Sequence, residues 1–191
     1  GPGLGNIAPS QADYFQAVKG GGHGDYHMLV LAPDSVQEMH DHALLAFELA
    51  DRYRTPVMIL SDGRLGQMME PVRLSEGAPP RPPMKPWAVD GARNRKPNAI
   101  RSLYLEEGRL EALNEALQEK YRRIARDEVR EERRHTDDCD ILLVAYGTCA
   151  RICKGALETA RAEGIAAGLL RPITLWPFPS ESIRALCPRL R

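Results

Sequence analysis

The sequence has no net charge, because 26 acidic side chains balance its 26 basic ones. This balance gives no reason to expect nucleic acid or an acidic membrane surface as a partner. The sequence also has no apolar run near the roughly 20 residues that cross a bilayer. Its start, GPGLGNIAPS, has neither the basic nor the apolar region of a signal peptide. The remaining composition, 43% apolar and 27% charged over 191 residues, is typical of a soluble globular protein with one ordinary domain or two small ones.

The four cysteines, Cys139, Cys149, Cys153 and Cys187, include no C-x-x-C pair. This spacing excludes a zinc knuckle and an iron–sulfur ligand run. Scattered cysteines in a chain of this size favour free thiols and a cytoplasmic location over a disulfide framework.

The two glycine-rich stretches lack the order of a phosphate-binding loop. Lys19 precedes Gly20–Gly22, and the predicted order there is helix, glycines, strand, whereas a P-loop has strand, glycines, lysine, helix. The first stretch, residues 1–6, ends in Asn6 where a dinucleotide-binding fingerprint has glycine. The second stretch is therefore interpreted as a mobile loop or packing joint. A role in a site stays open, because polar side chains (Lys19, His23, Asp25) accompany its glycines.

Two further small motifs have a structural interpretation. Thr148 follows a strand and Gly147, and is expected to cap a helix; anion binding by the helix amides is the alternative. His40 and His42 lie two positions apart on a predicted helix and point about 200° apart, so they cannot share a metal ion. Both are expected at the surface.

Apolar patterning predicts a first strand–helix–strand unit. MLVLA (Met28–Ala32) and PVMILSDG (56–63) have strand length, and Asp34 or Ser35 begins a helix between them that ends near Arg54. The apolar positions of this helix recur every three or four residues: Val36, Met39, Ala43, Ala46, Phe47 and Ala50. A short helix is predicted before the unit, over Ser10–Lys19, with Ser10 as its cap.

The pattern returns near the end of the chain, as a strand over Asp140–Gly147, a helix over 148–164 and a strand over 165–173. Apolar strands that alternate with helices indicate parallel pairing. Between the two units lie a proline-rich linker, Ser75–Pro97, and a long helix from Glu106 to about Arg134, charged almost all round in its second half. The expected stripe of this helix is Leu110, Leu113, Leu117, Tyr121 and Ile124.

The predicted fold class is α/β, with two incomplete parallel βαβ domains. A two-stranded parallel pair cannot cover its faces or be stable alone, so further sequence or a partner chain is expected to complete each sheet. The expected division is residues 1–74, then the linker and long helix over 75–136, then 137–191. Both ends of the sequence are expected to interrupt a longer protein.

GPGLGNIAPSQADYFQAVKGGGHGDY, LVLAPDSVQEM, PVMILSDG and GQMMEPV follow one another in this sequence. Together they resemble the alpha subunit of 2-oxoacid:ferredoxin oxidoreductases. The likeness is greatest to the 3-methyl-2-oxobutanoate (2-ketoisovalerate) enzyme, and the 2-oxoglutarate enzyme is second. CDILLVAYGTCARICKGA and GLLRPITLWPFPSE resemble the start of the second domain of that family, which is similar to the transketolase C-terminal domain. The resemblance covers nearly the whole chain in the right order.

The resemblance implies a thiamine-diphosphate enzyme. Such an enzyme decarboxylates a 2-oxoacid oxidatively, passes two electrons through iron–sulfur clusters to ferredoxin and transfers the acyl group to coenzyme A. Residues 1–74 would belong to the pyrimidine-binding-type domain that packs on the cofactor. The resemblance assigns diphosphate, Mg²⁺ and the clusters to the beta subunit or to a ferredoxin-like (gamma) subunit of a cytoplasmic hetero-oligomer, which agrees with the lack of a cluster-ligand run here.

The resemblance carries no catalytic residue to this chain. In such alpha subunits a Tyr-Pro-Ile-Thr-Pro motif, an activating glutamate and a substrate arginine precede GPGLGN, and this sequence begins at Gly1. The chain alone is therefore expected to be inactive. The residues expected at the cofactor are Gly1, Pro2, Gly3, Gly5, Asn6, Lys19, Gly20, Gly21, Gly22, His23 and Asp25. His27, His40, His42 and Arg64 depart from the family pattern and are interpreted as surface variation.

Two other functions remain open from the residues. One is a non-catalytic interaction module made of two half-domains on a linker. The other is a stand-alone nucleotide-binding α/β protein, which fits the βαβ units but not the failed glycine motifs. The 2-oxoacid itself is not determined by the sequence, since the contacts to its side chain are expected upstream or in the partner.

Overall fold

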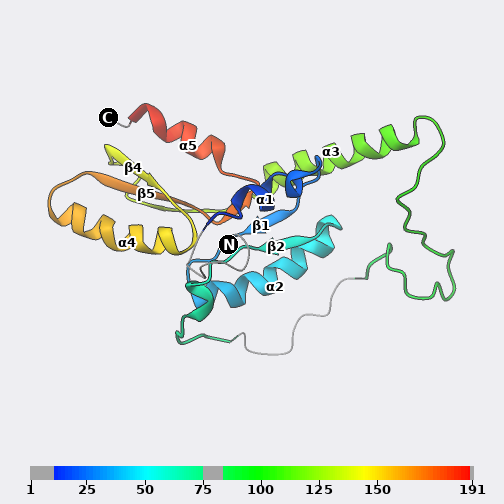
Figure 1. Cartoon of the computed structure of the whole chain (residues 1–191), viewed down its shortest axis with the longest axis horizontal. Helices are drawn as coiled ribbons and strands as arrows, with labels where there is room; N and C mark the ends of the chain where they lie inside the picture. The colour runs from blue at the N-terminus through cyan, green and yellow to red at the C-terminus, as the bar shows by residue number, and fades with distance from the viewer. Residues whose placement is uncertain (1–10, 75–83, 190–191) are drawn as a thin grey trace. The chain divides into compact units, whose positions relative to one another are not determined.

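The computed structural model describes residues 11–74 and 84–189 (Figure 1). The chain forms two compact units: a main unit, Gly1–Leu74 with Arg123–Arg191, and an arm unit, Ser75–Arg122. The predicted cap Ser10 and the centre of the proline-rich linker lie outside the described residues. Among the helices that the structure describes, none has the length and apolar character to cross a bilayer.

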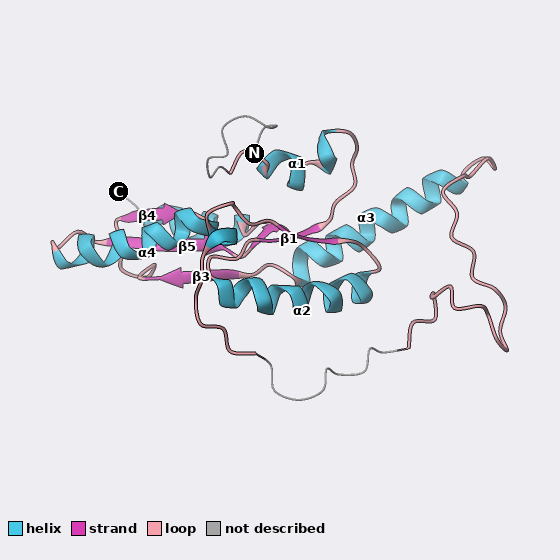
Figure 2. Cartoon of the chain, turned by 60° about the horizontal axis from the view of Figure 1, so that its bottom comes forward, coloured by secondary structure: helices cyan, strands magenta, loops and turns pink. Residues whose placement is uncertain are grey.

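The first sheet of the main unit contains the first predicted βαβ unit. β1 (Leu29–Leu31) pairs in parallel with β2 (Val57–Ile59), and α2 (Val36–Tyr53) connects them and packs along β2 (Figure 1). Figure 2 shows α2 on one side of β1. A third strand, β6 (Thr174–Trp176), pairs antiparallel with β1, so that the strand order is β2-β1-β6. The parallel pair is confirmed, and a strand from far along the chain joins it.

The second sheet has the same construction. β4 (Ile141–Val144) is parallel to β5 (Ala167–Pro172), and α4 (Gly147–Ala162) connects them and packs along β5. The antiparallel third strand is β3 (Glu131–Arg134), which gives the order β3-β5-β4. The central strand β5 is buried along its whole length.

The long predicted helix ends earlier than expected. α3 runs over Arg109–Asp127, and the charged residues that follow it form β3. The sequence of this strand, two Glu followed by two Arg, has no apolar pattern that would indicate a strand. Glu131 and Glu132 are half-buried, and pairing with β5 overrides the local preference for helix. The prediction of a helix as far as Arg134 is therefore wrong over its last turns.

α2 begins as predicted, because the Ser35 side chain accepts a hydrogen bond of 3.2 Å from the Glu38 amide. Its predicted apolar stripe is only partly correct. Phe47 is 76% exposed, whereas His42, expected at the surface, is 93% buried, with a relative exposure of 7%. Leu49 shares the buried face with His42, since the two residues are seven positions, or two helical turns, apart.

The remaining elements are short. α1 (Tyr14–Val18) is shorter than the helix predicted over Ser10–Lys19, and a 3₁₀ turn, η1 (Gly20–Gly22), follows it directly. Two other 3₁₀ turns and one helix complete the described chain: η2 (Leu65–Gln67), α5 (Ser180–Leu186) and η3 (Cys187–Arg189).

Each sheet has its own apolar core. On the first sheet, Ala17 and Val18 of α1 pack with Val30 of β1 and Leu175 of β6. On the second, Leu157 of α4 packs against β5 through a small cluster completed by Ala167, Leu169 and the partly buried Leu143, Cys153 and Ala160. Helix α1 is thereby fixed to the first sheet, which determines where the glycine turn after it lies.

A buried ion-pair cluster joins the two halves of the main unit. Arg171 of β5 is 1% exposed and pairs with Asp34 at 3.0 Å, Glu132 at 2.8 Å and Glu38 at 2.5 Å. Lys154 of α4 also contacts Asp34 and Glu132, at 2.5 and 2.7 Å. The two βαβ units therefore share one set of charges, in which Arg171 and Glu38 are 133 positions apart in sequence.

Candidate functional site

The second glycine stretch forms a tight surface turn. Gly20, Gly21 and Gly22 have φ values of 58°, 64° and 76°, in the left-handed region that other residues rarely adopt. Backbone bonds of 3.0 Å close the turn, from the Gly22 amide to the Lys19 carbonyl and from the His23 amide to the Gly20 carbonyl. The stretch is a compact joint between α1 and β1.

Tyr26 closes the turn from one side. A Cβ added to Gly21 would lie 2.5 Å from the Tyr26 hydroxyl oxygen, closer than any real contact. At Gly20, which is buried, an added Cβ would lie 3.4 Å from the Tyr26 carbonyl oxygen. Glycine at position 21 is thus favoured chiefly by its backbone angle, since the exposed Tyr26 side chain would have to move aside for an added Cβ.

The structure brings together six of the residues expected at the cofactor on this one turn. Lys19, His23 and Asp25 are exposed around the three glycines, so their side chains are available to a ligand or a partner chain. The other five, Gly1, Pro2, Gly3, Gly5 and Asn6, lie outside the described residues.

His27, just after the turn, was expected as surface variation but is half-buried. Its ring stacks on Trp176 of β6, with centroids 4.6 Å apart and planes 4° apart. Burial and the nearby Lys19 lower the pKa of His27, while Asp25 works in the opposite direction. The stack ties the end of the glycine turn to the strand contributed by the second half of the chain.

A small polar cavity lies where the strands of both halves end. Its volume is about 20 Å³, and it is lined by Gln11, Asp13, Leu60, Ser61, Asp62, Tyr146 and Gly147. The carboxyl ends of parallel strands are where α/β sheets usually place ligands. This cavity, however, has room for about one water molecule.

Asp62 satisfies the start of α4 from the other half of the main unit. Its Oδ2 accepts a bond of 3.3 Å from the Thr148 amide, and its Oδ1 accepts 3.0 Å bonds from the amides of Arg64 and Leu65. Burial works to raise the pKa of Asp62, but the hydrogen bonds from these backbone amides lower it. An ionised carboxylate therefore already lies against the positive end of the helix.

This arrangement corrects the predicted role of Thr148. The helix begins at Gly147 and its N-cap residue is Tyr146, so Thr148 lies inside the first turn and is 8% exposed. An anion site at these amides is not favoured, since Asp62 occupies the position that an anion would take. Nothing in the sequence indicated this contact, although Asp62 lies at the end of a predicted strand.

Tyrosines form the apolar wall beside the cavity. The rings of Tyr14 and Tyr146 lie 5.9 Å apart, and the Tyr146 carbonyl accepts a 2.9 Å bond from the Gln11 side chain. Burial, together with the neighbouring Tyr14, raises the pKa of Tyr146 to about 12. Both phenols stay neutral over the physiological range, and neither is poised as a base.

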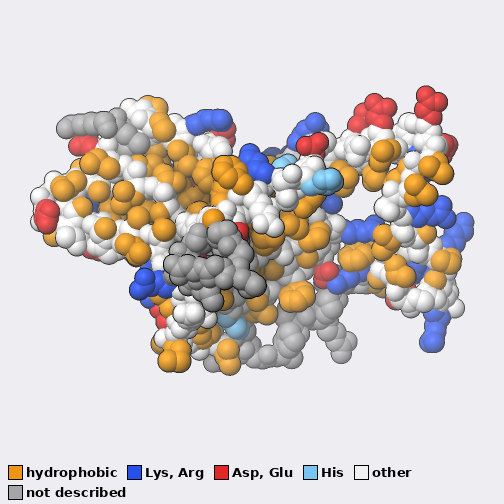
Figure 3. Space-filling model, in the orientation of Figure 1, with side chains coloured by type: hydrophobic (Ala, Val, Ile, Leu, Met, Phe, Trp, Pro, Cys, Tyr) orange, Lys and Arg blue, Asp and Glu red, His pale blue; other side chains and the backbone are white. Residues whose placement is uncertain are grey.

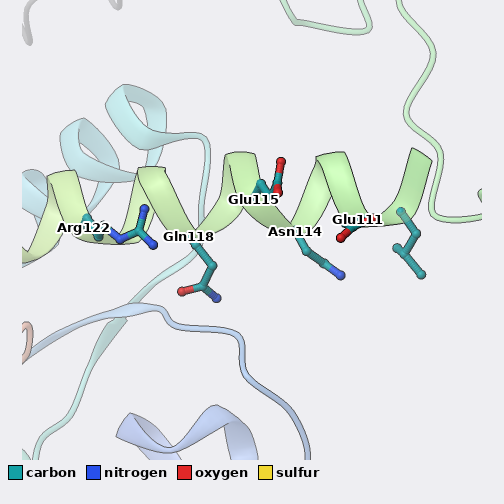
Figure 4. A pocket seen from close by; sticks show the side chains of 6 residues that line it. Glu111, Asn114, Glu115, Gln118 and Arg122 are labelled. Carbon is teal, nitrogen blue, oxygen red and sulfur yellow. The ribbon is translucent and has the colours of Figure 1, made fainter. Parts of the chain in front are cut away.

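A second hollow, of about 680 Å³, lies along one helix of the arm unit and is no enclosed site. The residues that line it are Leu110, Glu111, Asn114, Glu115, Gln118 and Arg122, all from α3. Figure 4 shows these side chains spread along a single helix. One helix face cannot enclose a ligand, so this hollow is open surface.

The described residues do not form a complete site for thiamine diphosphate. A cofactor of that size needs a cleft of roughly 300 Å³ or more, whereas the cavity at the strand ends measures about 20 Å³. Within the described ranges, no three His, Cys, Asp or Glu side chains are grouped as metal ligands. We therefore derive no step of a reaction through the cofactor from these residues.

Two family models match the chain. Pyruvate flavodoxin/ferredoxin oxidoreductase, thiamine diphosphate-binding, matches residues 1–135. Pyruvate:ferredoxin oxidoreductase core domain II matches residues 139–191. Together these two models cover nearly the whole chain.

Relatives agree with the models. Ketoisovalerate oxidoreductase subunit VorB of Methanothermobacter marburgensis and that of Methanothermobacter thermautotrophicus are each 57% identical over 97% of this chain and 53% of their own length. The 2-oxoglutarate synthase subunit KorA of Archaeoglobus fulgidus is 34% identical over 93% of this chain and 51% of its own length. The chain thus spans about half the length of the curated relatives it matches.

A solved structure shows the same fold. It is the 2-oxoglutarate:ferredoxin oxidoreductase from Magnetococcus marinus with 2-oxoglutarate, coenzyme A and succinyl-CoA bound. The TM-score is 0.78 at 20% identity, over 100% of this chain and 38% of that one. The predicted α/β fold and the resemblance are confirmed, and the chain belongs to the pyruvate flavodoxin/ferredoxin oxidoreductase family.

Proposed function

We propose that this chain is part of a subunit of a thiamine-diphosphate-dependent oxidoreductase that converts 3-methyl-2-oxobutanoate to its acyl-CoA, with ferredoxin as electron acceptor. The choice of substrate rests on one observation, the difference in sequence identity between this chain and its two groups of relatives. Identity is 57% to the two ketoisovalerate subunits and 31–35% to the four 2-oxoglutarate synthase subunits from archaea, over similar shares of this chain.

The cofactor is proposed to lie between this subunit and a beta subunit. The beta subunit or a ferredoxin-like (gamma) subunit would hold the diphosphate, Mg²⁺ and the iron–sulfur clusters, and the complex would act in the cytoplasm. The relatives named above are themselves called subunits, which supports an assembly of several chains. We also propose that the chain has three parts, which are residues 1–74, 75–136 and 137–191.

The glycine turn is the part of the described chain proposed to contact the cofactor. Three exposed polar side chains, Lys19, His23 and Asp25, surround glycines whose backbone is held in one conformation. Such a turn allows close approach of its backbone to a ligand. The first glycine stretch, Gly1, Pro2, Gly3, Gly5 and Asn6, is proposed to line the same site.

A reconstitution assay tests the proposed activity. The 191-residue chain alone is compared with the complex assembled from the full-length subunit and its partners, by viologen reduction with coenzyme A and either 3-methyl-2-oxobutanoate or 2-oxoglutarate. We expect no reduction by the chain alone, and a higher kcat/KM for the branched acid in the complex. Reduction by the chain alone would contradict the assignment of catalytic groups to other segments, and a preference for 2-oxoglutarate would favour the alternative enzyme.

The glycine turn is tested in the same complex. Lys19→Ala and Asp25→Ala are expected to raise the thiamine diphosphate concentration needed for half-maximal activity. The matched control is Lys120→Ala on α3, which removes the same type of side chain from a residue that is not part of the turn. An unchanged cofactor requirement in both turn variants would remove the turn from the site. A complex with no activity at any cofactor concentration would instead support a non-catalytic interaction module.

A further inference from the structure

Cys149 and Cys153 lie one turn apart on α4. Four positions separate them, which places both side chains on the same face of the helix, about 40° apart around its axis. Both thiols are free, and Cys149 is exposed whereas Cys153 is half-buried. Neither cysteine is among the residues proposed to contact the cofactor, so the pair has no role in the site described above.

The core of the second sheet holds one of the two thiols in place. The Cys153 side chain packs against the buried cluster of Leu157, Ala167 and Leu169. Burial raises the pKa of the Cys153 thiol, and the neighbouring Cys149 raises it further, so the two sulfur atoms are close enough to interact electrostatically. Cys153 is therefore anchored, and Cys149 lies beside it in contact with solvent.

The spacing of the pair does not suit a disulfide. Residues four positions apart on a helix have Cβ atoms about 5–6 Å from each other. A disulfide needs a Cβ separation of about 3.5–4.5 Å, so closing the bond would distort α4. The wider spacing leaves room for one atom between the two sulfurs, which a bridging ion can occupy.

The number of ligands decides which ion fits between the sulfurs. Of the residues that the structure describes, no three His, Cys, Asp or Glu side chains are grouped so that they could hold one metal ion. Zinc in structural sites takes four protein ligands in a tetrahedron, so two thiolates do not complete a zinc site. Cu(I) is a soft ion that prefers sulfur, and it is stable with two thiolates in a linear arrangement.

The surface around the pair is apolar. On α4 the residues one turn from either cysteine are uncharged, and Ile152, between the two, is 63% exposed. Hydrophobic side chains, among which cysteine is counted, gather over the part of the main unit with α4 and β4 in Figure 3. The basic side chains of this part of the helix, Arg151 and Lys154, pair with carboxylates instead. Neither of these two cations is therefore available to pair with the thiolates.

We propose that Cys149 and Cys153 form a two-coordinate site for a soft monovalent metal ion, Cu(I). Each thiol gives up its proton and forms a sulfur–copper bond. The bound group, two thiolates and one Cu(I), carries one negative charge. No electron is transferred, because the copper stays Cu(I) and both sulfurs stay at the thiolate level.

Competition for Cu(I) with bicinchoninate, a coloured chelator, tests the site in the absence of oxygen. The 191-residue chain is expected to withdraw one ion per molecule, with an affinity that rises with pH because the thiol protons must leave. Cys149→Ala and Cys153→Ala are each expected to weaken binding at least tenfold. Cys187→Ala removes another exposed thiol and is expected to leave the affinity unchanged. In the full-length subunit, Cys149→Ala is expected to remove one bound ion.

A moved cysteine is the matched control for the geometry. Cys153→Ala combined with Glu158→Cys keeps the number of thiols, but the second thiol is then nine positions from Cys149, about 180° around the helix. This variant is expected to bind Cu(I) as weakly as Cys153→Ala alone. X-ray absorption of the ion bound to the unmodified chain is expected to show two sulfur neighbours.

Three results would overturn the proposal. The first is a chain that withdraws no ion from the chelator. The second is an unchanged affinity in Cys149→Ala, and the third is a moved-cysteine variant that binds as tightly as the unmodified chain; either would mean an adventitious ion only. Cys149 is exposed, so its replacement leaves the core unchanged, and circular dichroism of this variant checks that the helices are intact.

Discussion

Arg171 should be the most costly charged residue to remove from the main unit. It is 1% exposed and pairs with Asp34, Glu38 and Glu132. Burial works to lower the pKa of Arg171, but these three carboxylates raise it. The guanidinium therefore stays charged at both pH values of the assay described below. Arg171→Met keeps the length of the side chain but leaves the carboxylates without their common cation.

The loss of unfolding free energy in Arg171→Met depends on the ion pairs that remain in the variant. Removing one partner of a buried ion pair costs about 3–5 kcal/mol. Lys154 still contacts Asp34 and Glu132 in the variant, whereas Glu38 loses the Arg171 guanidinium as its partner. We therefore expect the lower end, about 3 kcal/mol of unfolding free energy. For a chain of this length that corresponds to a fall in Tm of roughly 6–12 °C.

The dependence on pH gives a second measurement. Burial works to raise the pKa of Glu132. Hydrogen bonds from Lys154 and Arg134 and the charge of Arg171 outweigh this effect and lower the pKa from 4.5 to about 2. A depressed folded-state pKa adds stability that is present above the unfolded value of 4.5 and is lost as the pH falls toward 2. The penalty of Arg171→Met should thus shrink below about pH 5, because the orphaned carboxylates become protonated.

The assay is urea and thermal unfolding followed by circular dichroism at pH 7 and pH 3. Arg184→Met is the control, since that side chain is 73% exposed and its loss should change the free energy of unfolding by less than about 0.5 kcal/mol. A Tm within about 2 °C of the unmodified chain at pH 7 would refute the assignment of Arg171 as the charge that joins the two halves.

Three further predictions concern the site region. Gly21→Ala should lower the free energy of unfolding by about 1–3 kcal/mol, because φ is 64° and the added Cβ meets the Tyr26 hydroxyl. In urea unfolding, the control Gly63→Ala should be near neutral, because there is open space beside Gly63. Equal effects of the two substitutions would contradict the turn geometry. Asp62→Ala should lower the free energy of unfolding by about 1 kcal/mol, because the hydrogen bond to the start of α4 is lost. Asp62→Asn keeps an accepting oxygen and should lower the free energy of unfolding less. If the denaturant midpoints had the reverse order, capping by Asp62 would be excluded. The pKa of Tyr146 is raised to about 12, so its contribution to stability is complete below pH 10 and is lost as the pH rises through 12; absorbance at alkaline pH should show one late-titrating phenol that Tyr146→Phe removes.

The sequence predicts the parts of the fold that have a local cause. Apolar runs and caps locate both βαβ units, and Ser35 caps α2 as expected. β3 could not be predicted, because Glu131–Arg134 has no apolar pattern and becomes a strand by pairing with β5. One of its acidic residues, Glu132, forms an ion pair with Arg171, which lies 39 positions further along the sequence.

The same limit applies to the candidate site. The glycine turn was located by its own residues, since positive φ is a property of glycine itself. Asp62 and Thr148 meet across 86 positions of sequence, and His27 stacks on Trp176 from the far end of the chain. Such contacts depend on how the two halves pack, which no single stretch of the sequence encodes.

The two edges of the second sheet differ in how readily they can pair with a strand of another chain. β3 presents Glu131–Arg134, and an edge strand of charged side chains resists pairing with another chain. β4, at the opposite edge, presents aliphatic residues, of which Ile141 is 51% and Val144 45% exposed. Growth of this sheet, whether by a native strand or by aggregation, is therefore directed to the β4 side. Val144→Lys should improve the solubility of the isolated chain more than any single substitution on β3.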